Sequence, residues 1–474
     1  MFRKLYKEAN NDIEVDKSLK ESTADKMLNT NVNNRRPKNI FKFATITVVI
    51  VMVISSFFIK SNRVNPYAIA EPAYPTKIKF DDLDEKINRR EDIDEKFLKN
   101  LKDFSIKSSS LVLRETDKDT NSLYSPISLY MALSMVSETA NEDTQKEILE
   151  ALNMDNIEMV RSETGKLFRR LYYHNEIGKL SLGNSLWLKN DVEFNSELLD
   201  LLAKEYYASS FSLDFNDKGS PKKISKWVSE QTGGKLGKNS DEFSFNPDDV
   251  MTLINTIYFY DEWVDSFNVE NTKEDEFYLA DGSIVKSDFM NMTYGSHGFV
   301  GADGYTVSYL NLKNSSQMVF ILPDEGVSPY DIISDPELLD EALNSLSTDE
   351  RQMGEVIFRI PKFNFSSSIE LIEICKTLGI ENAFEITADF TNLSNTKPLF
   401  ISNIKQNSAI SIDEKGVEAT AFTQIDYCGA AQPDGKAEMI LNRPFIFAIT
   451  GVDGSPLFIG IINNPVEKFL QREY

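Results

Sequence analysis

The stretch Glu414–Tyr427, EKGVEATAFTQIDY, combines the pattern of a β-strand with an alternate face of small side chains. Every second residue of the stretch from Val417 onward is small or short, and these residues form one face of the strand: Val417, Ala419, Ala421 and Thr423. The residues between them are larger or polar: Glu418, Thr420 and Phe422. Alternation of this kind is typical of a strand. The next residues, CGAAQPDGK, predict an open loop, so a strand-like segment leads directly into a loop.

The chain is acidic and has few residues suited to metal binding. It has 474 residues, of which 41% are hydrophobic and 26% charged, as is ordinary for a globular protein. The net charge of −23 argues against nucleic acid as a partner, because phosphate binding needs clustered Lys and Arg. The cysteines and histidines form no CxxC or Cys/His ligand spacing. We therefore expect neither a metal site nor nucleic-acid binding.

Common catalytic signatures are absent from the sequence. It contains no GxSxG elbow, no HExxH and no Walker loop. The Gly- and Lys-containing stretch Thr232–Ser240 follows a helical pattern instead of a strand, so it is not expected to bind phosphate. His174 and His297 have no catalytic partners nearby in sequence and are predicted to be surface or hydrogen-bonded side chains. We therefore expect a protein that is not an enzyme and needs no cofactor.

The N-terminal region differs from the rest of the chain. Residues 1–42 are polar and rich in Asn, Lys and Arg, which predicts a disordered cytoplasmic segment. Residues 43–59, FATITVVIVMVISSFFI, are uncharged and near the short limit for a membrane-spanning helix. Ten Lys and Arg residues precede this run and only Lys60 and Arg63 follow closely, so the positive-inside rule places the bulk of the chain outside the cell. The alternative is a cleaved signal peptide with its cleavage site at Ala68–Ala70.

The remainder of the chain divides into a spacer and a globular region. Residues 60–92 contain Pro and many charges and predict an extracellular tether. Residues 93–474 show helical periodicity mainly in the earlier part and strand-like apolar runs mainly in the later part. This order favours an α+β fold over alternating βαβ units.

Five stretches of the globular region resemble, in order and spacing, the signatures of the serpin family. They are NSLYSPISLYMALSM (Asn121–Met135), LINTIYFYDEWVDSF (Leu253–Phe267), the PKF strand, helix and ADF segment of Ile360–Ser394, the hinge at Glu414–Tyr427, and RPFIFAIT…SPLFIGIINNP (Arg443–Pro465). Together with the apolar N-terminal run, the resemblance predicts a membrane-anchored, prokaryote-type serpin.

The resemblance implies both a fold and a mechanism. Serpins are α+β domains of three β-sheets and eight or nine helices with an exposed reactive loop, and they are metastable suicide inhibitors of serine and some cysteine proteases. The protease cleaves the loop and forms an acyl-enzyme, after which the loop inserts as a strand into sheet A. The expected partner is therefore a serine protease in a covalent complex with a monomeric, extracellular inhibitor.

An inserting strand gives a physical reason for the small alternate face. That face must pass between packed strands, where large, charged or Pro side chains would raise the barrier. Gly416 supplies a flexible pivot. The predicted hinge comprises Glu414, Gly416, Val417, Glu418, Ala419, Thr420, Ala421, Phe422 and Thr423. The alternatives are a plain surface hairpin and a non-inhibitory serpin that acts as a binding module.

The resemblance also assigns residues that control the opening of sheet A. The matching shutter and breach positions are Ser125, Ser128, Asn255, Trp263 and Gln406. Gln406 stands where the family usually has a His that hydrogen-bonds near Asn255. Because Gln is both donor and acceptor, the contact is expected to survive without the pH dependence of His.

The position of the scissile bond is predicted from family spacing. Counting from Glu414 gives Ala430–Ala431, whereas counting back from Pro444 gives a point about three residues later, near Pro433. A small residue at this bond suits elastase-like or subtilisin-like proteases. In order of preference, the candidates are Ala430–Ala431, Tyr427–Cys428 and Lys436.

The two cysteines are not expected to pair. Cys375 falls in a predicted helix and is expected to be buried as a small hydrophobic side chain. Cys428 falls in the predicted loop, and a disulfide between them would pin that loop.

Overall fold

The computed structural model describes residues 65–466, except residues 89, 239–242, 244, 247–248, 418–434 and 453. The predictions for residues 1–42 and 43–59 lie outside this part of the chain, as do the hinge beyond Val417 and the first two candidates for the scissile bond. Within the described residues, no helix combines the length and apolar character needed to cross a bilayer.

Strand β1 (Ala68–Ala70) shows that the folded domain begins earlier than predicted. It pairs antiparallel with β5 (Ala208–Leu213) at the edge of a sheet. Tyr74 follows and stacks on Tyr172, with ring centroids 5.7 Å apart. The predicted tether over residues 60–92 is therefore wrong from the strand onward. A three-residue strand and one aromatic ring, set among Pro and charged residues, are too short a pattern for periodicity to reveal.

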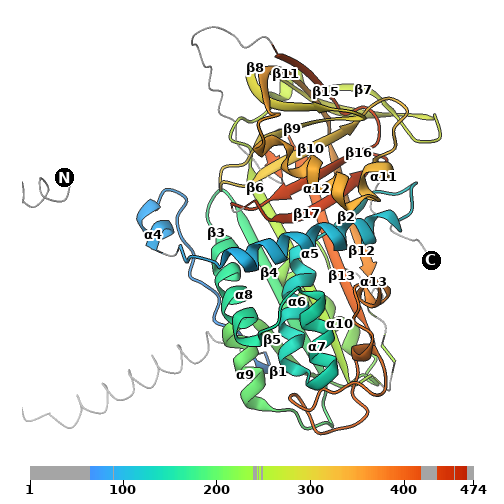
Figure 1. Cartoon of the computed structure of the whole chain (residues 1–474). Coiled ribbons are helices and arrows are strands. Elements are labelled where there is room, and N and C mark those ends of the chain that lie inside the picture. Colours follow the sequence, from blue (N-terminus) through green and yellow to red (C-terminus); the bar gives the residue numbers. More distant parts are fainter. Residues whose placement is uncertain are drawn as a thin grey trace, which may run out of the picture. The chain divides into compact units, whose positions relative to one another are not determined.

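In chain order, the helices are α4 (Leu83–Asn88), α5 (Glu95–Arg114), α6 (Pro126–Thr139), α7 (Glu142–Ala151), α8 (Ile157–Leu171), α9 (Ser196–Glu205), α10 (Ser220–Gln231), α11 (Pro329–Ile333), α12 (Pro336–Asn344) and α13 (Ile372–Thr377). The described residues thus form ten α-helices, and the predicted eight or nine is a slight undercount. Three of the ten have only five or six residues, so they carry little periodic pattern. Figure 1 shows α5 to α9 grouped against one side of the sheets.

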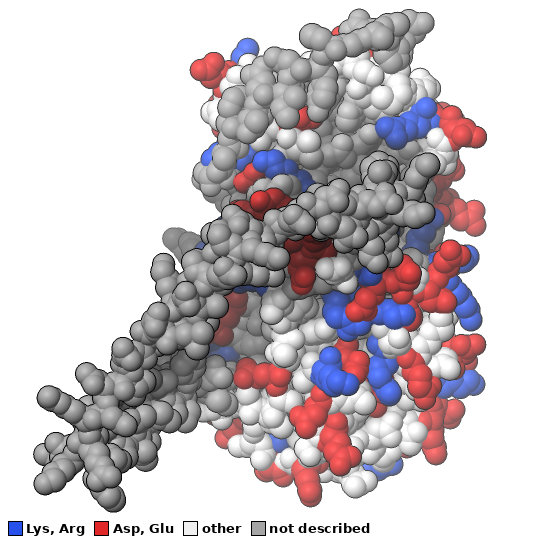
Figure 2. All heavy atoms as spheres, turned by 90° about the vertical axis from the view of Figure 1, so that its left-hand side faces the viewer, with Lys and Arg blue, Asp and Glu red and all other residues white. Residues whose placement is uncertain are grey.

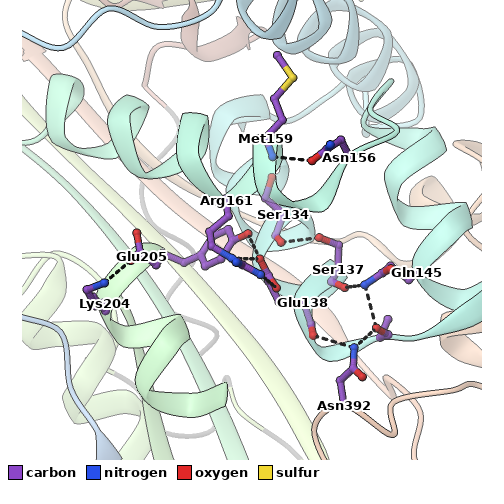
Figure 3. Close-up of polar contacts among 12 residues, drawn as sticks. Ser134, Ser137, Glu138, Gln145, Asn156, Met159, Arg161, Lys204, Glu205 and Asn392 are labelled. Atoms are coloured by element: carbon purple, nitrogen blue, oxygen red, sulfur yellow. Dashed lines mark hydrogen bonds and ion pairs between the residues drawn. The ribbon is translucent and has the colours of Figure 1, made fainter. Parts of the chain in front are cut away.

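Helix α6 is the centre of this helical layer, because all of its residues are buried. Its end is tied to α8 by Glu138, whose carboxylate accepts two 2.7 Å hydrogen bonds from Arg161 (Figure 3). The Tyr206 hydroxyl donates a third bond of 2.7 Å to the same carboxylate. A buried carboxylate with this set of donors is fully compensated, so α6, α8 and the end of α9 form a fixed support behind the sheet.

The first sheet contains the segments that the resemblance assigned to sheet A, and that name is used here. Its additional strands are β3 (Tyr173–His174), β4 (Lys179–Lys189), β6 (Met251–Glu262), β12 (Phe363–Glu370), β13 (Ile404–Asp413) and β14 (Gly416–Val417). Their order is β1-β5-β4-β6-β14-β13-β12, and β3 pairs with β4. Two long strands, β6 and β13, therefore lie at the middle of the sheet with the two-residue strand β14 between them at one end.

The remaining strands form one continuous ladder, sheet B. They are β2 (Ser122–Tyr124), β7 (Lys273–Tyr278), β8 (Ile284–Ala302), β9 (Tyr305–Asn311), β10 (Gln317–Pro323), β11 (Gln352–Pro361), β15 (Gly435–Ile440), β16 (Phe445–Thr450) and β17 (Pro456–Ile462). The prediction of three sheets is therefore corrected to two hydrogen-bonded sheets among the described residues. The cause is β8, which has 19 residues and pairs with β7 and β11 along its first part and with β9 at its end.

The charged surface is mixed. On the face in Figure 2, Lys and Arg side chains are interspersed with Asp and Glu and do not gather into one basic patch.

Candidate functional site

Sheet A is closed at one end and divided at the other. At the closed end, β6 and β13 pair directly and in parallel, from Leu253 opposite Ile404 to Thr256 opposite Asn407. At the divided end, β14 lies between them and pairs antiparallel with both strands. Because neighbouring strands lie about 4.8 Å apart, β6 and β13 are separated by about twice that distance there.

Gly416 fits the divided end because it has no side chain. It pairs with Glu262 of β6 and with Asp413 of β13. A Cβ atom added at Gly416 would lie 2.2 Å from the Asp261 carbonyl oxygen and 2.7 Å from the Glu262 Cα. Both neighbours are backbone atoms, so they could not move aside without distorting the ladder. Gly416, which was predicted as a flexible pivot, is thus also the residue that the close approach of the β6 backbone requires.

Val417 begins the small alternate face, and it points into the core. Its exposed fraction is 1%. It lines a narrow gap with Phe259, Ile410 and Phe458. Side chains two residues apart on a strand share a face. The structure therefore shows that Val417 itself faces inward, and the rest of the predicted hinge lies outside the described residues.

Glu414 fixes the base of the hinge. Its carboxylate lies 3.1 Å from the Lys362 ammonium and accepts a 2.8 Å hydrogen bond from Thr272. Burial raises the pKa of Glu414, but hydrogen bonds from its own backbone, Thr272 and Lys362 outweigh burial, so the pKa lies below its ordinary value. The Phe267 backbone N–H donates a 2.7 Å bond to the Glu414 carbonyl. The chain is thus anchored immediately before the pivot.

Trp263 provides a second anchor beside Glu414. Its side chain is fully buried. Its Nε1 donates a 2.9 Å hydrogen bond to the Asp413 carbonyl, and its backbone N–H donates one of 2.8 Å to the Lys415 carbonyl. The predicted breach residue therefore holds the turn between β13 and β14.

The other assigned residues meet at the closed end of sheet A. Gln406 is 2% exposed and bonds twice to Ser125: its Oε1 accepts from the backbone N–H at 2.7 Å, and its Nε2 donates to the carbonyl at 2.9 Å. The prediction that Gln could act as donor and acceptor here is confirmed. Ser128 donates its hydroxyl hydrogen to Asn255, which stands opposite Gln406 in the ladder.

Asn184 belongs to the same network, and sequence reasoning missed it. Its Oδ1 accepts a 2.6 Å hydrogen bond from the Asn255 Nδ2. It stands opposite Asn255 in the ladder between β4 and β6. A polar residue within the apolar run LSLGNSLWL was the available signal. The shutter therefore links α6 to three adjacent strands of sheet A.

The far end of the loop is fixed in sheet B. Strand β15 begins at Gly435 and pairs in parallel with β11. Lys436 lies within this ladder opposite Glu355. The third candidate for the scissile bond is therefore wrong, because a ladder-bonded residue cannot extend into a protease active site. The first two candidates lie outside the described residues.

Cys375 and His297 are both buried side chains. Burial raises the pKa of the Cys375 thiol to about 12, so the thiol is an inert part of the core, as predicted. His297 is hydrogen-bonded, as predicted, through Nε2 at 2.7 Å from the Tyr309 carbonyl oxygen. Burial lowers the pKa of His297.

The comparisons with known proteins agree with this mixed sheet, in which the short strand β14 lies between the two central strands β6 and β13. The family profile for serpins, serine protease inhibitors, matches residues 99–465. The chain is 32% identical over 364 residues to a serine protease inhibitor of Rattus norvegicus, covering 75% of this chain and 86% of that protein. It is 29% identical over 368 residues to alpha-1-antiproteinase S of Cavia porcellus, covering 75% and 88%. The chain belongs to the serpin family.

Solved structures share the fold. The thermophilic serpin tengpin in its native state superposes with a TM-score of 0.70 at 30% identity, covering 83% of this chain and 97% of tengpin. Human thyroxine-binding globulin in complex with thyroxine gives a TM-score of 0.70 at 26% identity, covering 78% and 99%. The predicted fold family is therefore confirmed, whereas the prokaryote-type and membrane-anchored character stays a prediction.

Proposed function

We propose that this serpin is a suicide inhibitor of serine proteases, and the same proposal extends to some cysteine proteases. It traps the acyl-enzyme by inserting its cleaved loop into sheet A. The observation that carries this proposal is β14, where Gly416 and Val417 already lie between β6 and β13. Insertion then lengthens the existing strand β14, so no new strand has to be started between β6 and β13.

Extending the register of β14 beyond Val417 gives the place that we propose for each residue of the inserting strand. Val417 stands opposite Asp261 in β6 and Ile412 in β13. Continuing both antiparallel ladders places Ala419 beside Phe259 and Ile410. The same register places Ala421 beside Ile257 and Ser408, and Thr423 beside Asn255 and Gln406. These six β6 and β13 residues have exposed fractions of 8% or less, so only small side chains fit opposite them.

Complete insertion must also open the shutter. Thr423 reaches the level at which Asn255 and Gln406 now pair with each other. The new strand has to break this ladder, while the bonds of Gln406 to Ser125 hold β13 in place. The shutter therefore sets a barrier to spontaneous insertion, and cleavage of the loop frees the chain that crosses it.

The proposals for the target and the scissile bond rest on family spacing and on the residues of the loop. We propose cleavage at Ala430–Ala431 by an elastase-like or subtilisin-like protease, with Tyr427–Cys428 as the second choice. The inhibitor acts as a monomer and contributes no catalytic residue of its own. Residues 43–59 anchor it in the membrane with the serpin domain outside the cell.

A non-inhibitory binding module is the second candidate. The structural likeness to thyroxine-binding globulin favours it, because that protein is solved with a small molecule bound. The inward-facing, buried Val417 favours the inhibitor instead.

The test is incubation of the full-length protein with a panel of serine proteases, followed by denaturing electrophoresis and mass spectrometry of the released C-terminal peptide. We expect a denaturant-stable complex with an elastase-like or subtilisin-like protease, and a peptide that begins at Ala431. Cleavage of the loop by every protease without any stable complex would refute inhibition and leave the binding module.

A further inference from the structure

The segment that carries the proposed bait contains no residue after which a trypsin-like protease cuts. Such proteases cut after Lys or Arg, and residues 416–435 include neither. The nearest basic residue before this segment is Lys415, and the nearest one after it is Lys436. Both lysines belong to the described part of the chain, so the structure shows how each of them is held.

Lys415 is fixed in the turn that joins β13 to β14. Its backbone N–H donates a 2.9 Å hydrogen bond to the Asp413 carboxylate, and its carbonyl accepts one of 2.8 Å from the Trp263 backbone N–H. The next residue, Gly416, is paired with strands on both sides. A protease binds a substrate segment that has left the fold, so the bond after Lys415 is not available to it.

Lys436 is the second residue of β15 and lies in the parallel ladder with β11, opposite Glu355. Ala437 and Met439, which follow it, have exposed fractions of 7% and 0%, so the core holds the strand just beyond the lysine. The Lys436 ammonium lies 3.2 Å from the Glu438 carboxylate and 3.9 Å from that of Glu355. Both its backbone and its side chain are therefore engaged.

The backbone holds Lys436 more firmly than the ion pairs do. The Lys436 side chain is 56% exposed, and ion pairs between exposed side chains contribute little. Strand β15 lies at the edge of sheet B beside β11 (Figure 1), which is its only partner strand among the described residues. The ends of an edge strand open most readily, so the first contact of β15 decides whether Lys436 stays paired.

That first contact is an unusually close approach of two glycines, Gly354 of β11 and Gly435 of β15. A Cβ atom added at Gly354 would overlap the Gly435 carbonyl group and lie 2.6 Å from the Gly435 Cα. A Cβ atom added at Gly435 would lie 2.7 Å from the Met353 carbonyl oxygen and 3.1 Å from the Phe299 ring. Since the nearest atom in each case is a backbone atom, no side-chain rotation would relieve the overlap. A glycine within a strand often marks such an approach of a second backbone.

The neighbouring ladder is irregular at the same place. Gly354 stands opposite His297 of β8, and the register between β8 and β11 shifts between Gly354 and Val356. An irregularity of this kind bends a strand and redirects its edge. It lies where β15 joins β11, so the start of β15 depends on the local shape of β11.

We propose that Gly354 and Gly435 set the specificity of the inhibitor by exclusion: their contact starts β15 early enough to hold Lys436 in the ladder, and trypsin-like proteases then find no cleavable bond at either end of the loop. The two glycines are positioning residues, because they act through the backbone of Lys436. The proposal deepens the proposed function and rests on it in one respect, namely that proteases act on this loop. It names a class of protease that the inhibitor does not take as a target.

Limited digestion of the folded, full-length protein with trypsin, followed by mass spectrometry, tests the exclusion. We expect the bonds after Lys415 and Lys436 to stay intact in the native sequence. In Ala430→Arg, which places a basic residue within the loop, trypsin should attack the new site, whether the product is cleaved protein or a stable complex. Rapid cutting after Lys415 or Lys436 in the native sequence would overturn the proposal. Resistance of Ala430→Arg would also overturn it, because the composition of the loop would then not be the cause.

Gly354→Ala tests the role of the glycine contact. The added methyl group should displace the start of β15, so we expect cutting after Lys436 to become at least about tenfold faster. Gly301→Ala is the matched control: it lies in β8 of the same sheet, no atom lies within 4 Å of the added Cβ, and the native rate should persist. Adding Lys436→Gln to Gly354→Ala should abolish the new cut.

Gly435→Ala places the methyl group on the other side of the contact and should also speed the cut, which covers the case in which Gly354→Ala does not fold. Native resistance in both alanine variants, an equal rise in Gly301→Ala, or an equal rise at lysines throughout the domain would each overturn the role of the two glycines. Digestion by trypsin requires no insertion into sheet A. Failure of the exclusion would therefore leave the proposed inhibition standing, and a lack of inhibition would leave the exclusion standing.

Discussion

Replacing Ala421 with Glu tests the register of the inserting strand. The proposed register would place residue 421 on the inward face after insertion, beside Ile257 and Ser408, which have exposed fractions of 1% and 0%. Phe422→Glu is a matched control, because it introduces the same charge one residue later on the outward face. Both variants introduce a glutamate, and the proposed register places the two carboxylates on opposite faces of the strand; Phe422→Glu also removes an aromatic ring.

The pKa of Asp261 gives an estimate of the free energy needed to bury a carboxylate in sheet A. Burial moves the pKa of Asp261 from 3.8 to about 6, which corresponds to about 3 kcal/mol even with its hydrogen bonds in place. A glutamate at position 421 would have only the Ser408 hydroxyl as an adjacent side-chain donor. We therefore expect insertion of the Ala421→Glu strand to be less favourable by at least about 3 kcal/mol than insertion of the native strand. If the carboxylate is already buried in the transition state, insertion becomes roughly 100-fold slower.

The assay is the partition between stable complex and cleaved inhibitor after reaction with one target protease. Slow insertion lets the acyl-enzyme hydrolyse, so Ala421→Glu should yield almost only cleaved inhibitor, whereas Phe422→Glu should yield mostly complex. Equal partition for the two variants would refute the register, and a larger loss for Phe422→Glu would show that the opposite face inserts.

Three further predictions concern the stability of the native protein, measured by denaturant unfolding. Gln406→Ala leaves the N–H and carbonyl of Ser125 unpaired in the core and should cost about 2–4 kcal/mol; a cost below about 1 kcal/mol would mean that water replaces the amide. Lys362→Met removes the cation beside Glu414 but should cost only about 1 kcal/mol, because the Lys362 side chain is 36% exposed. Tyr74→Ala removes the ring that stacks on the domain and should cost about 2–3 kcal/mol; no loss would show that the N-terminal segment contributes nothing to stability.

Local pattern and motif spacing were sufficient to predict the inward direction of Val417 and the two-sided hydrogen bonding of Gln406. The alternation that begins at Val417 predicted its inward direction, since a strand has a fixed period of two. Gln406 was placed near Asn255 by counting from Glu414, and its two-sided hydrogen bonding to Ser125 followed from the chemistry of an amide.

Contacts that depend on distant segments could not be predicted in this way. Asn184 and Asn255 are brought together only by the pairing of β4 with β6. Asn314 reaches Asp261 from a turn of the other sheet, where nothing in the sequence marks it. Strand β8 joins what were expected to be two separate sheets, because its length lets it pair with different partners along its course.

The most direct test of insertion is the unfolding temperature of the full-length protein before and after a single cleavage in the loop. The account predicts a large rise, because the cleaved loop adds a full strand to sheet A between β6 and β13 and buries its small face. An unchanged or lowered unfolding temperature, with the cleavage confirmed by mass spectrometry, would contradict insertion as the basis of function.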